Sequence, residues 1–184
     1  MGTNIFEGCT NTTGFSWSSS YNEIPAGTFK GCNNIQTLEI PSYITVVDAE
    51  AFMNCTSISG VSFPQGIQYI GGSLRNYNAL NGAFKGCLGI SGEIILPSSL
   101  EQLGRYAFYD SNLISTFKFY STTAPLTRVD AFPLKFINDP NNNPIHAPVG
   151  SEASYAGQSY SPSYSTYGDR NPVNWDSLNI IFDL

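Results

Sequence analysis

The chain carries a short segment, Phe-x-x-Cys, that recurs at an almost constant spacing. Copies begin at Phe6, Phe29 and Phe52 at equal intervals, and a similar interval returns near the end of the series, between Phe84 and Phe108. Only the interval from Phe52 to Phe84 is longer. A period of about 23 residues lies in the range of repeat architectures, so the sequence predicts a stack of similar coils. The Phe positions are Phe6, Phe29, Phe52, Phe84, Phe108 and Phe132.

Between these segments, apolar residues alternate with other residues as in a half-buried strand. Leu38 and Ile40 follow Cys32, and Pro41 comes next, where a missing backbone N–H ends the strand. A second apolar pair, Ile44 and Val47, follows the Pro. Each repeat is therefore expected to run through a strand, a Pro turn, a short extended stretch and a tight turn that carries Phe. Strand pairs in the other repeats are Phe15/Trp17, Val61/Phe63, Ile94/Leu96 and Phe117/Phe119, and later second pairs are Ile67/Ile70 and Leu100/Leu103.

One such unit cannot bury its apolar face alone, so neighbouring coils must stack. We expect one domain over residues 1–184, with about five coils of this period in 5–132 and a C-terminal cap in 133–184. This strand-rich α/β solenoid would hold the Phe side chains in a continuous inner column.

The Cys residues share the period of the repeat, which favours a packing role. Ser111 fills the equivalent position in the fifth copy, and the spacing of a zinc site is absent. We expect free thiols in a ladder, and disulfides between adjacent coils remain an alternative in an exported chain. The ladder consists of Cys9, Cys32, Cys55 and Cys87.

At this level of detail the repeat resembles a known family. Residues 38–55 read Leu-x-Ile-Pro-Ser-x-Ile-x-x-Val-x-x-x-Ala-Phe-x-x-Cys, and residues 91–108 repeat the pattern closely. Both resemble the BspA-like (Treponema pallidum-type) leucine-rich repeat. The resemblance implies a right-handed superhelix with one strand per repeat on its concave side. It also implies export to the surface of an anaerobic, often gut or oral, bacterium, and a role in adhesion or in binding host or matrix protein.

The C-terminal part resembles the closure of that family, from Thr122 to Tyr155 and then Asn174-Trp175. Two departures stand out. An insertion lies within 71–82, and a long segment separates Tyr155 from Trp175, where the family usually has a short link. We expect Tyr155 and Trp175 to cap the last coil.

The charge and the apolar pattern exclude some classes of partner. The net charge is −6 and the eight Lys and Arg are scattered, which disfavours binding to a nucleic acid backbone. No apolar run is long enough to span a bilayer, and no signal-peptide pattern is present at the start. The expected extracellular or cell-surface location is what the family resemblance implies.

Strand alternation nominates a first candidate binding surface on the concave face. Its members are expected to point away from the core, in the way that solenoids present a face to extended partners. The alternative, that small residues there merely let the sheet curve, stays open. The face consists of Thr37, Glu39, Ser62, Glu93, Ile95, Thr116 and Lys118, with Gly14, Ser16 and Gly60 beside them.

The second candidate surface is a Tyr-rich loop. Tyr160, Tyr164 and Tyr167 are separated by Ser, Pro and Thr, a composition typical of recognition loops. The loop could equally lie over the exposed end of the solenoid.

Catalysis is not expected, and neither is a metal or a cofactor. His146 is the only His, so Ser-His or Cys-His activation could be built only around it. Glu39 and Glu93 could form a carboxylate pair for glycoside hydrolysis, but the intervening coil would separate them by about 10 Å. The two main hypotheses are a binding module for a host or matrix protein or a surface glycan, and a passive spacer in a larger surface protein. The apolar first coil, with Ile5 and Phe6, further suggests either preceding repeats or an end-to-end homodimer.

Overall fold

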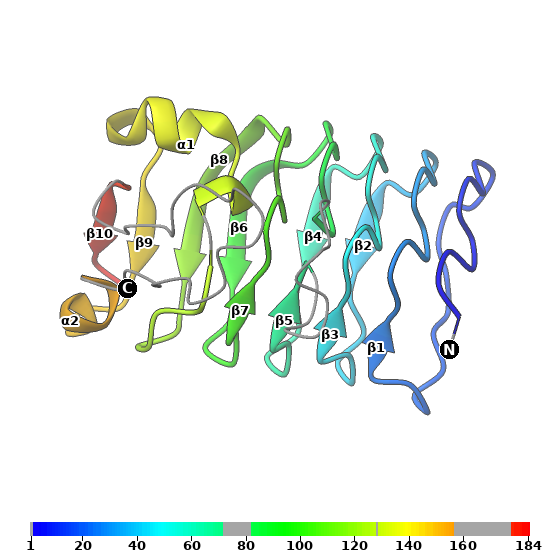
Figure 1. The fold of residues 1–184 in the computed structure, drawn as a ribbon, viewed down its shortest axis with the longest axis horizontal. Helices are drawn as coiled ribbons and strands as arrows, with labels where there is room; N and C mark the ends of the chain where they lie inside the picture. The colour runs from blue at the N-terminus through cyan, green and yellow to red at the C-terminus, as the bar shows by residue number, and fades with distance from the viewer. Residues whose placement is uncertain (1, 72–81, 128, 157–177) are drawn as a thin grey trace, which may run out of the picture.

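The protein is a row of coils stacked along one axis. The computed structural model describes residues 2–71, 82–127, 129–156 and 178–184. The N- and C-terminal ends lie at opposite ends of the row (Figure 1). The predicted repeat architecture is confirmed in this respect.

One side of the row is formed by the strands that the alternation predicts. They pair in parallel, because each coil brings its strand beside the equivalent strand of the next. β2 (Thr37–Glu39) pairs with β4 (Gly60–Ser62). A four-stranded sheet, the broad sheet, then follows in the order β6 (Ser91–Leu96), β8 (Leu113–Phe119), β9 (Ile145–Ala147) and β10 (Ile180–Phe182).

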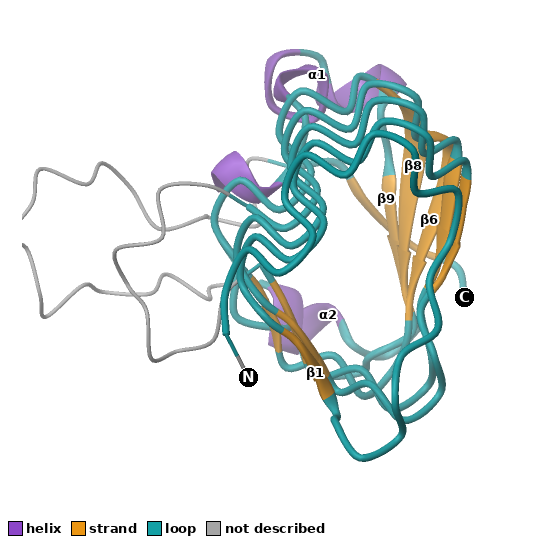
Figure 2. Cartoon of the chain, turned by 90° about the vertical axis from the view of Figure 1, so that its right-hand side faces the viewer, coloured by secondary structure: helices purple, strands orange, loops and turns teal. Residues whose placement is uncertain are grey.

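A second parallel sheet forms another side of each coil, where the sequence predicted only a short extended stretch. Figure 2 shows the two sheets on different sides of the coil's cross-section. The inward residues of this second sheet include Val47 and Ile70, both fully buried. Its strands, in spatial order, are β1 (Glu23–Ile24), β3 (Val46–Val47), β5 (Tyr69–Ile70) and β7 (Gln102–Leu103).

The Phe residues of the turns form the predicted inner column. Successive rings are stacked with centroids 5.2 to 5.4 Å apart. Each turn also donates backbone N–H groups to the next coil, as from Phe29 to Ala51 O at 2.7 Å. The residue two positions after each ring has a positive φ, which is why Gly stands there in Gly31 and Gly86. The rings of the column are Phe6, Phe29, Phe52, Phe84 and Phe108.

The Cys ladder is confirmed, with a feature that the sequence did not indicate. All four thiols are free, and those of the second to fourth copies are buried. Each buried thiol donates a hydrogen bond to the Phe carbonyl of the coil before it, as from Cys55 Sγ to Phe29 O at 3.0 Å. Ser111 Oγ makes the same bond to Phe84 O at 3.3 Å. The ladder therefore links coils by hydrogen bonds as well as by packing.

The C-terminal end is closed by short helices and by the last two strands of the broad sheet. Tyr155 is buried against Phe119 and Phe182 and donates its hydroxyl proton to Ser121 O at 3.0 Å. The predicted capping position of Tyr155 is confirmed, whereas Trp175 lies outside the described residues. The helices are the 3-10 turns Val129–Ala131 and Pro140–Asn142, and α1 (Leu134–Asn138) and α2 (Glu152–Tyr155).

One predicted strand is absent from the described part of the chain. Phe15 and Trp17 pack against the core but remain partly exposed, and their segment forms no strand. The Phe15 ring instead stacks on Phe29, with the ring centroids 4.3 Å apart. No helix among the described residues is long and apolar enough to cross a membrane.

Candidate binding face

The outward face of the broad sheet gathers charged and apolar side chains from four strands. The strand register places Ile95, Lys118, His146 and Ile181 in one row across β6, β8, β9 and β10. Because alternate residues of a strand share a face, Glu93 lies on the same side, one step along its strand. We call this surface the broad-sheet face.

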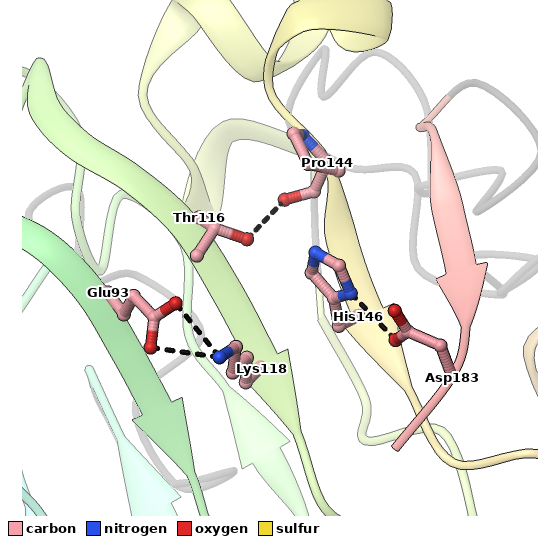
Figure 3. A network of polar contacts seen from close by, with 6 residues as sticks. All are labelled: Glu93, Thr116, Lys118, Pro144, His146 and Asp183. Carbon is pink, nitrogen blue, oxygen red and sulfur yellow. Dashed lines mark hydrogen bonds and ion pairs between the residues drawn. The ribbon is translucent and has the colours of Figure 1, made fainter.

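An ion pair joins the first two strands of the face (Figure 3). Lys118 Nζ lies 2.8 and 2.9 Å from the two carboxylate oxygens of Glu93. The hydrogen bond to Glu93, which is the main cause, raises the pKa of Lys118 above its ordinary value of 10.5. Lys118 therefore stays charged throughout the physiological range, and its position is held by a neighbouring coil.

A second polar pair joins the last two strands. His146 Nδ1 lies 2.7 Å from the Asp183 carboxylate, and 18% of the His146 side chain is exposed. An ionised carboxylate can only accept, so Nδ1 carries the proton that is shared between them. The only His of the chain is therefore held by a residue of the C-terminal closure, on the same face as Lys118.

The prediction that Thr116 belongs to the exposed concave face is wrong. It was expected to be exposed, but its exposed fraction is 8%. Its hydroxyl donates to Pro144 O at 2.8 Å, because the chain that enters β9 covers it (Figure 3). Thr116 thus positions the neighbouring strand.

Exposed apolar groups flank the two polar pairs. Ile95 is 49% exposed and Ile181 is 38% exposed at opposite edges of the row. Tyr120, 47% exposed, directly follows β8, two residues after Lys118. Among the described strands on this side of the molecule, the broad sheet alone combines polar pairs with exposed large apolar groups.

The N-terminal part of the same side of the molecule is different. Thr37, Glu39 and Ser62 are exposed on β2 and β4, as predicted. Apart from Glu39 they are small, and no exposed large apolar residue accompanies them on those two strands. The predicted binding residues therefore divide between a plain surface and the richer broad-sheet face.

The sequence pattern of the BspA type leucine-rich repeat region matches residues 1–81 and 76–132, in six copies. The chain belongs to this family. It matches no curated protein and no solved structure.

The BspA-type match ends at residue 132, and this divides the broad-sheet face. Glu93, Ile95 and Lys118 lie within the matched repeats, whereas His146 and Asp183 come from the closure. The sequence-based reasoning missed Ile181 and Asp183. Ile180, Ile181 and Phe182 are all apolar, so no alternation in the sequence marks Ile181 as outward, and only the pairing of β10 with β9 reveals it.

Two other predictions for the BspA-type chain concern the Tyr-rich loop and the absence of a metal site. Tyr160, Tyr164 and Tyr167 lie outside the described residues, so the Tyr-rich loop stays a prediction. No cluster of three or more metal-ligating side chains occurs among the residues that the structure describes.

Proposed function

We propose that this BspA-type chain is a non-catalytic binding module of a bacterial surface protein, and that a partner protein docks on the broad-sheet face. The observation that carries the proposal is the set of exposed apolar groups, Ile95, Tyr120 and Ile181, around two ordered polar pairs. Protein interfaces commonly combine apolar anchors with a polar surround in this way.

The rigidity of the face supports the proposal. Its residues lie on hydrogen-bonded parallel strands. Lys118 is held by the carboxylate of Glu93 on β6, and His146 is held by the carboxylate of Asp183, which directly follows β10. A surface that is ordered before binding loses less conformational entropy when the partner docks. A host or matrix protein is the partner class that fits such a broad, open face.

The same contacts favour binding over catalysis. Glu93, one half of the carboxylate pair considered for glycoside hydrolysis, is paired with Lys118. The register neighbours of His146 are Lys118 and Ile181, and neither is a hydroxyl or thiol nucleophile. The face thus offers recognition chemistry.

A passive spacer is the second candidate function, and the plain surface of β2 and β4 favours it for the N-terminal half. A spacer needs a regular, soluble stack and no dedicated partner. The two functions differ in whether changes to the broad-sheet face alter any interaction.

The test is a binding array of extracellular-matrix proteins and glycans, probed with the wild-type chain and with the double variant Ile95→Ser/Ile181→Ser. We expect protein ligands whose signal falls at least about tenfold in the double variant, which corresponds to about 1.4 kcal/mol. The matched control is Leu126→Ser, because Leu126 is comparably exposed but bridges to β7 in the other sheet. The control should bind like the wild type.

Three results would contradict the proposal. Absence of any ligand on the array would favour the spacer. Glycan signals that survive the double variant would show that the broad-sheet face does not bind the ligand. If those signals disappear when Tyr160, Tyr164 and Tyr167 are changed to Ala, the Tyr-rich loop is the binding site. Equal losses in the Leu126→Ser control would contradict the assignment to the broad-sheet face, because that variant leaves the face unchanged.

A further inference from the structure

Carboxylates outnumber cations on the side of the molecule formed by β2, β4 and the broad sheet, which we call the strand side. Glu39 on β2 is exposed, Glu93 lies on β6, and Asp183 directly follows β10. Lys118 is the one Lys or Arg on the described strands of this side. Even when His146 is protonated, three carboxylates there exceed two cations. A partner that approaches the strand side therefore meets an excess of negative charge.

In both polar pairs of the broad-sheet face, the acidic member is the more exposed (Figure 3). The exposed fraction of the side chain is 48% for Glu93 and 25% for Lys118. It is 48% for Asp183 and 18% for His146. An ionised carboxylate has about four lone-pair positions, so each can accept further hydrogen bonds from a ligand while its cation stays in place.

One ammonium group interacts with both carboxylates. The hydrogen bond to Glu93 is the main cause of the raised pKa of Lys118, and the charge of Asp183 raises that pKa further. Lys118 therefore orders Glu93 without neutralising the face as a whole. Complementary charge on a partner steers its approach and suppresses partners of the wrong sign.

Apolar groups lie in one row between these two carboxylates. Ile95 and Ile181 end the row that the strand register defines, with Lys118 and His146 between them. Three strand intervals of about 4.8 Å separate the two Ile residues by roughly 14 Å. A complementary surface thus needs two apolar contacts at this spacing, with basic groups beside them.

We propose that the partner of the broad-sheet face is a basic protein segment. Its apolar side chains contact Ile95 and Ile181. Its Lys or Arg side chains bind the exposed carboxylates of Glu93 and Asp183, and Arg fits better because its planar fork can donate two hydrogen bonds to one carboxylate. A second copy of the chain is disfavoured, because its net charge of −6 opposes contact with an acidic face. The inference rests on the function proposed above and adds the chemistry of the partner.

The test is a selection from a phage-displayed library of random peptides with the full chain as the target. Peptides of about 16 residues are long enough, because a helix of that length spans roughly 24 Å. We expect the recovered peptides to be enriched in Arg and Lys and to lose binding to Ile95→Ser/Ile181→Ser. Their association rate should fall as salt screens the exposed charges. The charge variant Glu93→Gln/Asp183→Asn should weaken binding at least about fivefold, or about 1 kcal/mol.

The matched control is the double variant Glu23→Gln/Asp48→Asn. It removes the same two charges at β1 and directly after β3, in the second sheet, which Figure 2 shows on another side of the coil. The recovered peptides should bind this control as they bind the wild type. The melting temperature of each variant, measured in parallel, reveals any loss of folding.

Recovered peptides without an excess of Arg and Lys over Asp and Glu would overturn the proposal, and so would equal weakening in the two charge variants. If the peptides require Ile95 and Ile181 but bind Glu93→Gln/Asp183→Asn like the wild type, the function proposed for the face stands and this inference fails. If no recovered peptide requires the two Ile residues, both fail. Self-association that Ile95→Ser/Ile181→Ser abolishes, measured by sedimentation, would assign the face to a second copy of the chain instead.

Discussion

The two halves of the strand side share one scaffold and differ in what they display. β2 and β4 present mostly small residues such as Thr37 and Ser62, whereas the broad sheet (β6, β8, β9 and β10) presents two polar pairs and exposed Ile95 and Ile181. Beneath both halves runs the same column of stacked rings. The repeat thus separates stability, which the inward positions supply, from recognition, which depends on the outward positions of particular coils.

The largest effects should come from the inner column and should be equal in the two halves. Phe29→Ala and Phe108→Ala each remove a fully buried ring, and each should lower the free energy of unfolding by about 3 to 5 kcal/mol. Phe6→Ala should lower it less, because the Phe6 side chain is 40% exposed. Urea denaturation measures all three. A large difference between Phe29→Ala and Phe108→Ala would break the idea of a shared scaffold.

Alkaline pH should destabilise the coils that bury a Cys thiol, which are those of Cys32, Cys55 and Cys87. Burial raises the pKa of Cys55 from its ordinary value of 9.0 to about 12. The folded state thus holds the thiol proton more tightly, so the stabilisation is complete below pH 9 and is lost as the pH rises towards 12. At pH 10 the loss from Cys55 should be about 1.4 kcal/mol.

The measurement is the free energy of unfolding at pH 8 and pH 10, compared between the wild type and Cys55→Ser. Serine can keep the hydrogen bond, as Ser111 does in the fifth copy, but does not titrate in this range. The variant should therefore lose less stability between the two pH values. An identical pH dependence would refute the assignment to this thiol.

The smallest effect on stability should come from the broad-sheet face. Glu93→Gln removes the ion pair with Lys118, whose partners are partly exposed. Such pairs contribute about 0 to 1 kcal/mol, so the thermal transition should shift little. The same change should alter binding of any partner that docks there. A strong destabilisation would show that the pair serves the fold rather than the surface.

The sequence predicted the structure best at positions that recur in every repeat. A residue that recurs once in every repeat must occupy the same place in each coil, so the ring column and the Cys ladder could be predicted from spacing alone. The outward positions of Glu93 and Ile95 followed from strand alternation. The hydrogen bonds from thiols to Phe carbonyls could not be predicted, because the spacing of residues does not indicate which groups donate and accept.

The closure was poorly predicted because it does not repeat. Pro144 covers Thr116 from 28 positions away in the sequence, and Asp183 meets His146 across 37 positions. No periodic signal links such residues. The strand expected at Phe15 and Trp17 is also absent, because an apolar pattern alone does not decide whether a segment pairs with its neighbours.

The long interval between Phe52 and Phe84 has a practical consequence for protein engineering. Their rings are 5.3 Å apart, much as the rings of Phe29 and Phe52 are, although the sequence between them is longer than in an ordinary coil. The junction after β5 therefore accepts added sequence without disturbing the packing of adjacent rings. Epitopes or affinity tags inserted at the matching junction after β3 should be displayed at a fixed height along the rod, with the neighbouring turns as their anchor.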